Sequence, residues 1–165
     1  MKSLLWREGK WSPSCIVNKN QMNSLNFRVE AAEDGTGELF LAVDYQGFSG
    51  SASCCMNLAA LREAAKEFAL YPLPAGRTVR LKGGYFAPDM KSLVQTHLHV
   101  SAVPIDSVGN VGLSVSLAVP NDEGISTYKA SLCCDFSVSY EQLKDLSRGL
   151  IALAERQRVE YSMAL

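Results

Sequence analysis

Residues 37–71 read GELFLAVDYQGFSGSASCCMNLAALREAAKEFALY, which predicts a strand, a turn, a second strand and a helix in succession. Its first part alternates apolar and polar residues, a period typical of a half-buried strand. Gln46-Gly47 predicts a tight turn into a second strand of small residues, since glycine takes the positive φ of hairpin turns. From Asn57 the apolar residues recur at helical spacing and form one side of a predicted helix. That side consists of Leu58, Leu61, Ala65 and Phe68.

The composition predicts one globular domain and narrows the classes of partner. A chain of 165 residues can bury a substantial core. The formal net charge is −1, from 16 basic and 17 acidic residues, which argues against nucleic acid or an anionic membrane as the main partner. No apolar run is long enough for a signal peptide or a spanning helix. Five cysteines, an odd number, predict reduced thiols in a cytoplasmic protein.

The remaining patterns extend the strand and helix prediction in both directions. Residues 25–31 alternate and precede an Asp-Gly turn, which predicts a further hairpin. Residues 78–82 predict a short strand, 83–90 a loop, and 93–103 a long strand with Val94 inward and His97 and His99 outward. Two more alternating segments follow. Ser139 with Gln142 then predicts a capping box that begins a second helix reaching to about residue 158.

The order strand, strand, strand, helix occurs twice, in residues 25–71 and 93–158. One interpretation is an internal duplication of a βββα unit. The alternative is two antiparallel meanders that look alike by chance. Both interpretations predict an α+β fold with one antiparallel sheet of about six to eight strands and both helices packed on one face.

No motif indicates catalysis, a metal site or a cofactor, and the chain is predicted not to be an enzyme. His97 and His99 could contribute to a zinc site with an outward cysteine, but solvated strand histidines explain them as well. Adjacent cysteines could be redox thiols, although small buried side chains are the more common use of cysteine. Gly47-Phe48-Ser49-Gly50-Ser51 resembles a nucleophile elbow only in spacing, since it lies between strands.

The outward face of the predicted sheet is the candidate binding surface. It would combine an aromatic side chain with charges of both signs, a composition found at protein interfaces. The residues proposed to bind a partner are Arg28, Glu30, Phe40, Arg80, His97 and His99. The alternatives are an ordinary solvated face, or a face covered by the N-terminal segment.

A family resemblance adds a named expectation. Five segments carry the resemblance: Gly37-Glu38-Leu39-Phe40-Leu41-Ala42-Val43, Gly47-Phe48-Ser49-Gly50, His97-Leu98-His99-Val100, Gly109-Asn110-Val111-Gly112 and Tyr140-Glu141-Gln142-Leu143. The pattern resembles WapI-like immunity proteins of bacterial polymorphic toxin systems over roughly residues 25–153. The resemblance implies a cytoplasmic protein that neutralises a cognate toxin by direct binding, without catalysis.

Two other functions stay open from the sequence. The first is a dimeric secretion-type chaperone or adaptor, for which a homodimer is the expected state. The second is a small-ligand-binding protein with a pocket between the sheet and the 83–90 loop.

Overall fold

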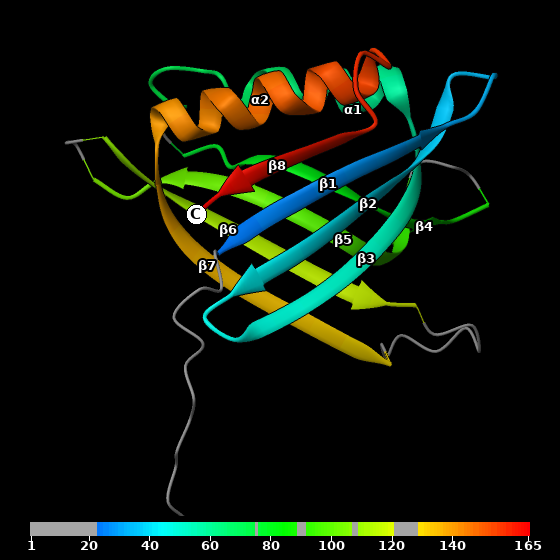
Figure 1. Cartoon of the computed structure of the whole chain (residues 1–165), viewed down its shortest axis with the longest axis horizontal. Helices are drawn as coiled ribbons and strands as arrows, with labels where there is room; N and C mark the ends of the chain where they lie inside the picture. The colour runs from blue at the N-terminus through cyan, green and yellow to red at the C-terminus, as the bar shows by residue number, and fades with distance from the viewer. Residues whose placement is uncertain (1–22, 75, 89–91, 107–108, 121–128) are drawn as a thin grey trace, which may run out of the picture.

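The computed structural model describes residues 23–74, 76–88, 92–106, 109–120 and 129–165. These residues form eight strands and two helices (Figure 1). The elements are β1 (Ser24–Ala31), β2 (Thr36–Tyr45), β3 (Phe48–Asn57), α1 (Leu58–Glu67), β4 (Val79–Phe86), β5 (Leu93–Pro104), β6 (Asn110–Val119), β7 (Ala130–Ser139), α2 (Tyr140–Ala154) and β8 (Glu160–Ala164). The predicted α+β class, with antiparallel strands and two helices, is confirmed.

The strands form two sheets of four rather than the single sheet predicted. Sheet A has the order β3-β2-β1-β8 and sheet B the order β4-β5-β6-β7. Figure 1 shows the sheets crossing one over the other, with both helices along the same side of the molecule. The prediction failed because spacing along the chain encodes hairpins only, and β3 and β4 are separated by a helix that leads the chain to the other sheet.

Each half of the chain contributes the strand after its helix to the sheet of the other half. After α1 the chain enters sheet B as β4, and after α2 it returns to sheet A as β8. Each sheet therefore consists of three strands connected by hairpins or a loop, and a fourth strand delivered by the helix of the other half. The proposed duplication at 25–71 and 93–158 stays a prediction, and so does the single domain.

The core lies between the sheets and beneath the helices. The inward side chains of β1, β2 and most of β6 alternate with outward ones, as the period of two predicts. The largest fully buried side chains are Leu25, Phe27, Leu39, Leu41, Leu61, Phe68, Leu81, Leu98, Leu113, Leu143, Leu146 and Leu150. Burying each such side chain contributes about 1.5–3 kcal/mol.

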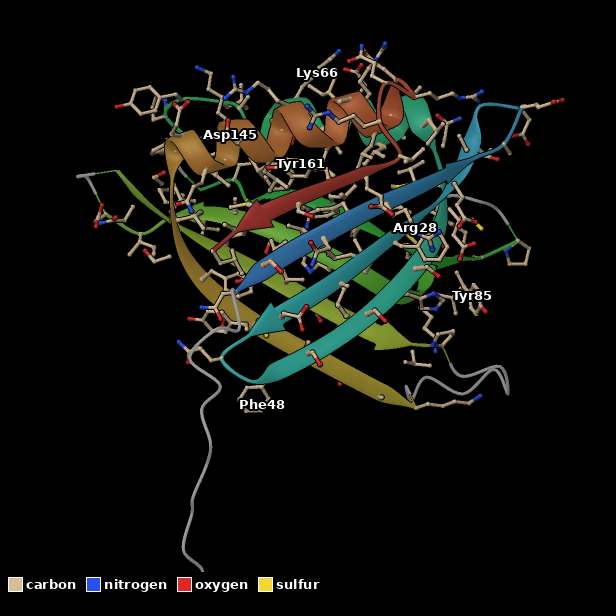
Figure 2. All side chains as sticks on the ribbon, viewed as in Figure 1. Arg28, Phe48, Lys66, Tyr85, Asp145 and Tyr161 are labelled. Atoms are coloured by element: carbon tan, nitrogen blue, oxygen red, sulfur yellow. The ribbon has the colours of Figure 1, made fainter. Side chains whose placement is uncertain are left out.

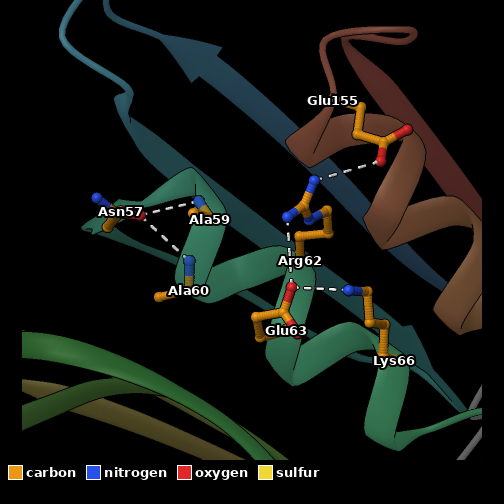
Figure 3. Close-up of polar contacts among 7 residues, drawn as sticks. All are labelled: Asn57, Ala59, Ala60, Arg62, Glu63, Lys66 and Glu155. Carbon is orange, nitrogen blue, oxygen red and sulfur yellow. Dashed lines mark hydrogen bonds and ion pairs between the residues drawn. The ribbon is translucent and has the colours of Figure 1, made fainter.

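Both helices begin at a side-chain cap. The Asn57 Oδ1 atom accepts hydrogen bonds from the Ala59 and Ala60 amides at 2.9 and 3.2 Å (Figure 3). The predicted capping box at Ser139 and Gln142 is confirmed, with reciprocal hydrogen bonds of 2.9 and 3.2 Å. The helices also pack against each other, and Arg62 of α1 lies 3.9 Å from Glu155, just after α2 (Figure 3).

The start of sheet B departs from the predicted pattern. Strand β4 continues to Phe86, so the loop predicted from Gly83 is wrong over its first four residues. The pairing of β4 with β5 shifts twice, between Gly83 and Gly84 and again between Tyr85 and Phe86. A Cβ at Gly84 would lie 2.0 Å from the Gln95 carbonyl oxygen, so the close approach requires glycine there. The shifts interrupt the alternation of β5, and Val94 is exposed where an inward side chain was predicted.

Strand β8 was not predicted. The second helix ends at Ala154 rather than near residue 158, and the chain returns along β1 with Leu25 opposite Met163. Tyr161 of β8 packs on Gly149 of α2, where an added Cβ would lie 2.5 Å from the ring. Among the described residues, neither helix is long and apolar enough to cross a membrane.

Candidate functional site

A groove of about 870 Å³ runs over the outer face of sheet A and past the edge strand β3. Its floor is formed by outward side chains of β1, β2, β3 and β8, and its wall by the ends of β4, β5 and β6. We call it the sheet A groove. Its lining residues include Asn26, Arg28, Glu38, Phe40, Ala42, Ser51, Ser53, Cys55, Tyr85, His97, Val119, Pro120 and Glu160.

One row of paired residues crosses the floor of the groove. Arg28 lies opposite Phe40 on β2 and opposite Glu160 on β8. The Arg28 guanidinium carbon is 4.1 Å from the centre of the Phe40 ring, a cation–π contact. The guanidinium also forms an ion pair with Glu30, two residues along the same strand. The floor therefore presents a flat aromatic ring with a cation fixed over it.

Two carboxylates face each other across the neighbouring row. Glu30 of β1 and Glu38 of β2 are register partners, and like charges directly opposite each other destabilise a sheet. Each has its own partner: Glu30 pairs with Arg28, and Glu38 accepts a hydrogen bond of 2.6 Å from the Ser53 hydroxyl. These contacts hold both acids in place and give the groove charges of both signs.

The wall of the groove contains a buried imidazole. His97 is 3% exposed, and its Nε2 atom lies 2.8 Å from the Oε1 atom of buried Gln95. The ring also meets Tyr85 edge to face, with the ring centres 4.4 Å apart. Burial lowers the pKa of His97, while a hydrogen bond to the Ser53 backbone opposes that shift. His97 therefore joins sheet B to β3 through its contacts with Gln95, Tyr85 and the Ser53 backbone.

The backbone of β3 borders the groove along its free edge. Tyr45 and Phe48 close the two-residue turn, so the β3 groups that bond to β2 belong to every second residue from Phe48. The backbone groups of Ser49, Ser51 and Ser53 then point away from β2. The contact of His97 with the Ser53 backbone agrees with this assignment. No residue of β3 is charged, and edge strands commonly carry charges that discourage pairing.

Large apolar side chains are exposed on the three strands of the wall, and two of them, Tyr85 and Val119, line the groove. Tyr85 and Phe86 at the end of β4 are 50% and 41% exposed, Val94 of β5 is 72% exposed, and Val119 of β6 is 41% exposed. Figure 2 shows Tyr85 at the same end of the sheets as Arg28, away from Phe48 at the β2–β3 turn. We call these four residues the apolar rim.

The structure divides the predicted binding residues among three places. Arg28 and Phe40 meet on the floor of the sheet A groove, with Glu30 at its margin. His97 was predicted outward and is instead buried in the wall, because the register shift in sheet B reorients this part of β5. Arg80 and His99 lie on the outer face of sheet B, apart from the groove.

Tyr85 and Val119 were missed as binding residues. Tyr85-Phe86 follows the two glycines that suggested a loop, although paired aromatics are good strand formers. That pair of aromatics was the available signal. For Val119, alternation predicts only which face a residue takes, and its place at the rim depends on how the two sheets cross.

Two cysteines of the described residues have thiols with a raised pKa. Burial raises the pKa of the Cys54 thiol to about 11, so this cysteine behaves as a small buried side chain packed against Gly83. Burial also raises the pKa of Cys134. In the described part of the chain, no three side chains of the metal-binding types gather at one place.

Comparison of the chain with protein-family models, with curated proteins and with solved structures finds no match in any of the three.

Proposed function

We propose that the chain is a non-catalytic domain that binds another protein through the sheet A groove and its apolar rim. The observation that carries the proposal is the Arg28–Phe40 stack on the outer face of a sheet. A sheet face that only contacts water gains little from such a contact, whereas arginine and aromatic residues dominate the energy of protein interfaces.

The surroundings of the stack support a protein partner. The apolar rim adds four side chains that are at least 41% exposed, and two of them, Tyr85 and Val119, line the groove beside a floor of mixed charge. An apolar patch bordered by polar groups is the usual composition of a binding surface. The uncharged edge of β3 offers backbone groups with which an extended segment of the partner could pair.

The partner we propose is a toxin domain, with the chain as its cytoplasmic immunity protein. This finer assignment rests on the resemblance to WapI-like immunity proteins. Neutralisation would need only tight binding over the partner's functional surface, so the chain needs no catalytic residues of its own.

The experiment is capture of the partner from the native host, followed by variants on the two sheet faces. Tagged chain is used as bait, the bound protein is identified by mass spectrometry, and the mass of the complex is measured by size-exclusion chromatography with light scattering. The same measurement is made with Phe40→Ala and Arg28→Ala, and with Arg80→Ala as the matched control on the outer face of sheet B. Truncating a central aromatic or arginine anchor is expected to weaken binding by about 2 kcal/mol, or roughly thirtyfold.

The toxin assignment has its own test. The captured protein is expressed alone and together with the chain, and growth of the cells is recorded. Growth arrest relieved by the wild-type chain, but not by Phe40→Ala, is the expected result. Binding that is equal in the Phe40, Arg28 and Arg80 variants would contradict the role of the groove, and a harmless partner would contradict the immunity function.

The volume of the groove favours one second candidate, a small-ligand-binding protein. About 870 Å³ lies within the range of ligand pockets, and polar groups from both sheets converge on it. Native mass spectrometry of the chain purified from its host distinguishes the two functions. A retained small molecule, lost in Phe40→Ala, would favour the ligand over the protein partner.

A further inference from the structure

Three basic side chains gather on the outer face of sheet B, away from the sheet A groove. Lys82 of β4 lies directly opposite His99 of β5, and Arg80 is opposite Ser101, the next outward residue of β5. Directly opposed side chains in an antiparallel pair have their Cβ atoms about 5 Å apart, and diagonal neighbours are about 7 Å apart. Lys82 and Arg80 are therefore both neighbours of His99 on this face, and the charges of both act on its ring.

Neither cation is neutralised by a carboxylate. Arg80 and Lys82 form no ion pair in the described part of the chain, whereas Arg28, Arg62, Lys66, Arg77 and Arg148 all do. The outward residues of β6 and β7 nearest to His99 are uncharged: Ser116 lies opposite His99, and Cys133 lies opposite Ser116. Asp135 is two strands further and accepts a hydrogen bond of 2.5 Å from Ser114.

The imidazole of His99 has a buried nitrogen atom whose hydrogen-bonding capacity is not used among the described residues. Its Nε2 atom is shielded from solvent and has no hydrogen-bond partner among the described residues. Burial lowers the pKa of His99, and the charges of Lys82 and Arg80 lower it further. A buried polar atom without a partner costs free energy, and such atoms often mark the place of an ion or ligand.

We propose that Arg80, Lys82 and His99 form a binding site for a small oxyanion with two negative charges, a phosphate group above all. Its oxygens would accept hydrogen bonds from the guanidinium and the ammonium, and also from the Nε2–H group of His99 once the side chains that shield this atom move aside. Charge-assisted hydrogen bonds of this kind are stronger than neutral ones. One anion would thus supply the missing partner of His99 and neutralise both cations. The site lies on a different sheet from the groove and does not depend on the function proposed for it.

The test follows the two imidazoles during a titration with inorganic phosphate. The sequence has two histidines, so ¹⁵N-labelled full-length chain without a histidine tag gives two imidazole spin systems. Both are recorded by long-range ¹H–¹⁵N correlation at constant pH, with sodium chloride of matched ionic strength in the control series. Phosphate is expected to shift the His99 signals to a plateau and to raise its pKa, while those of buried His97 stay in place.

Three variants connect the shift to the site. Lys82→Gln and Arg80→Gln are each expected to weaken phosphate binding about fivefold, since each removes one charge near the anion. Lys66→Gln on α1 is the matched control and is expected to bind like the wild type. Phosphoethanolamine is titrated in parallel: tighter binding than inorganic phosphate would indicate that the phosphate belongs to a larger ligand, and equal binding that the free ion suffices.

Two results would overturn the site. One is a His99 shift that chloride reproduces at the same ionic strength. The other is unchanged phosphate affinity in both Lys82→Gln and Arg80→Gln, with both variants folded by circular dichroism.

Discussion

Sheets A and B are built from the same order of elements, but one strand pairing of sheet B is irregular. In each, three strands in sequence are followed by a helix, and a fourth strand comes from the other half. The pairings of sheet A run without interruption, as between β2 and β3 from Thr36–Asn57 to Tyr45–Phe48. In sheet B the β4–β5 pairing shifts between Gly83 and Gly84. This irregularity is where the candidate site gains its wall.

The difference shows that the wall of the sheet A groove depends on the irregular pairing of β4 with β5. An uninterrupted β5 would carry His97 on the same outward face as His99. The shift instead buries His97 against Gln95, Tyr85 and the Ser53 backbone of the other sheet. The groove of sheet A is therefore completed by residues that sheet B presents only because its register is irregular.

The largest loss of stability is expected when the space at the register shift of sheet B is filled by a side chain. Gly84→Ala would place its Cβ 2.0 Å from the Gln95 carbonyl oxygen, which belongs to the backbone and cannot move aside alone. We expect a loss of about 3 kcal/mol in the free energy of unfolding, measured by urea denaturation. Gly112→Ala on β6 is the control, since its added Cβ comes no closer than 3.4 Å to any atom and should cost less than about 1 kcal/mol. Equal stability of the two variants would show that β4 and β5 can re-pair without the shift.

Replacing His97 should have the next largest effect and a distinct pH dependence. His97→Phe keeps a ring against Tyr85 but leaves buried Gln95 without its partner, for a loss of about 2 kcal/mol. Because burial lowers the pKa of His97 from 6.5, the unfolded chain takes up a proton first as the pH falls. The His97 contribution is complete above about pH 6.5 and is lost as the pH falls toward the pKa of the folded state.

Urea denaturation between neutral and mildly acidic pH checks this pH dependence. The wild type should lose stability on acidification more steeply than His97→Phe. His99, whose pKa is also lowered, should keep part of the slope in the variant. A variant with the full slope of the wild type would assign the pH dependence to other groups.

The smallest expected effect is a difference in stability between variants of exposed cations on the two outer sheet faces. Arg28→Ala removes the contact with Phe40 and the ion pair with Glu30, and we expect a loss of about 0.5–1 kcal/mol. Lys82→Ala removes a charge that only disfavours protonation of His99, and stability should stay within about 0.5 kcal/mol of the wild type. Thermal unfolding in low salt measures both, and a greater loss for Lys82→Ala would mean that this side chain is engaged within the fold.

The sequence predicts those parts of the fold that local patterns determine. The alternation of β2, the turn at Gln46-Gly47, the buried side of α1 and the capping box of α2 all depend on neighbours within a few residues, and all are present. The division into two sheets depends on where the chain goes after each helix. Nothing in the spacing of residues 68–78 decides between pairing β4 with β3 and pairing it with β5.

The part of the candidate site that could be predicted is likewise the part that local strand pairing determines. Arg28 and Phe40 lie on neighbouring strands joined by a short turn, so their contact follows from hairpin register. His97 and Tyr85 meet at an irregular pairing, which a strict period of two cannot represent. In β8 the half-buried Tyr161 and the buried Met163 alternate with exposed residues, and that pattern was readable, but the second helix was predicted to reach about residue 158 and no strand was predicted after it.

The exchange of β4 and β8 has a consequence for the way the chain is made. On the ribosome, β1, β2 and β3 emerge first, yet the strand that covers the outer edge of β1 is β8, which is synthesised only after α2. Until then β1 presents an unpaired edge to the crowded cell, and the hydrophobic face of sheet A is covered only as sheet B and the helices are added. The edge of β1 is therefore expected to stay unpaired until α2 and β8 have been synthesised, and chaperones that shield β edges should protect the nascent chain during that time.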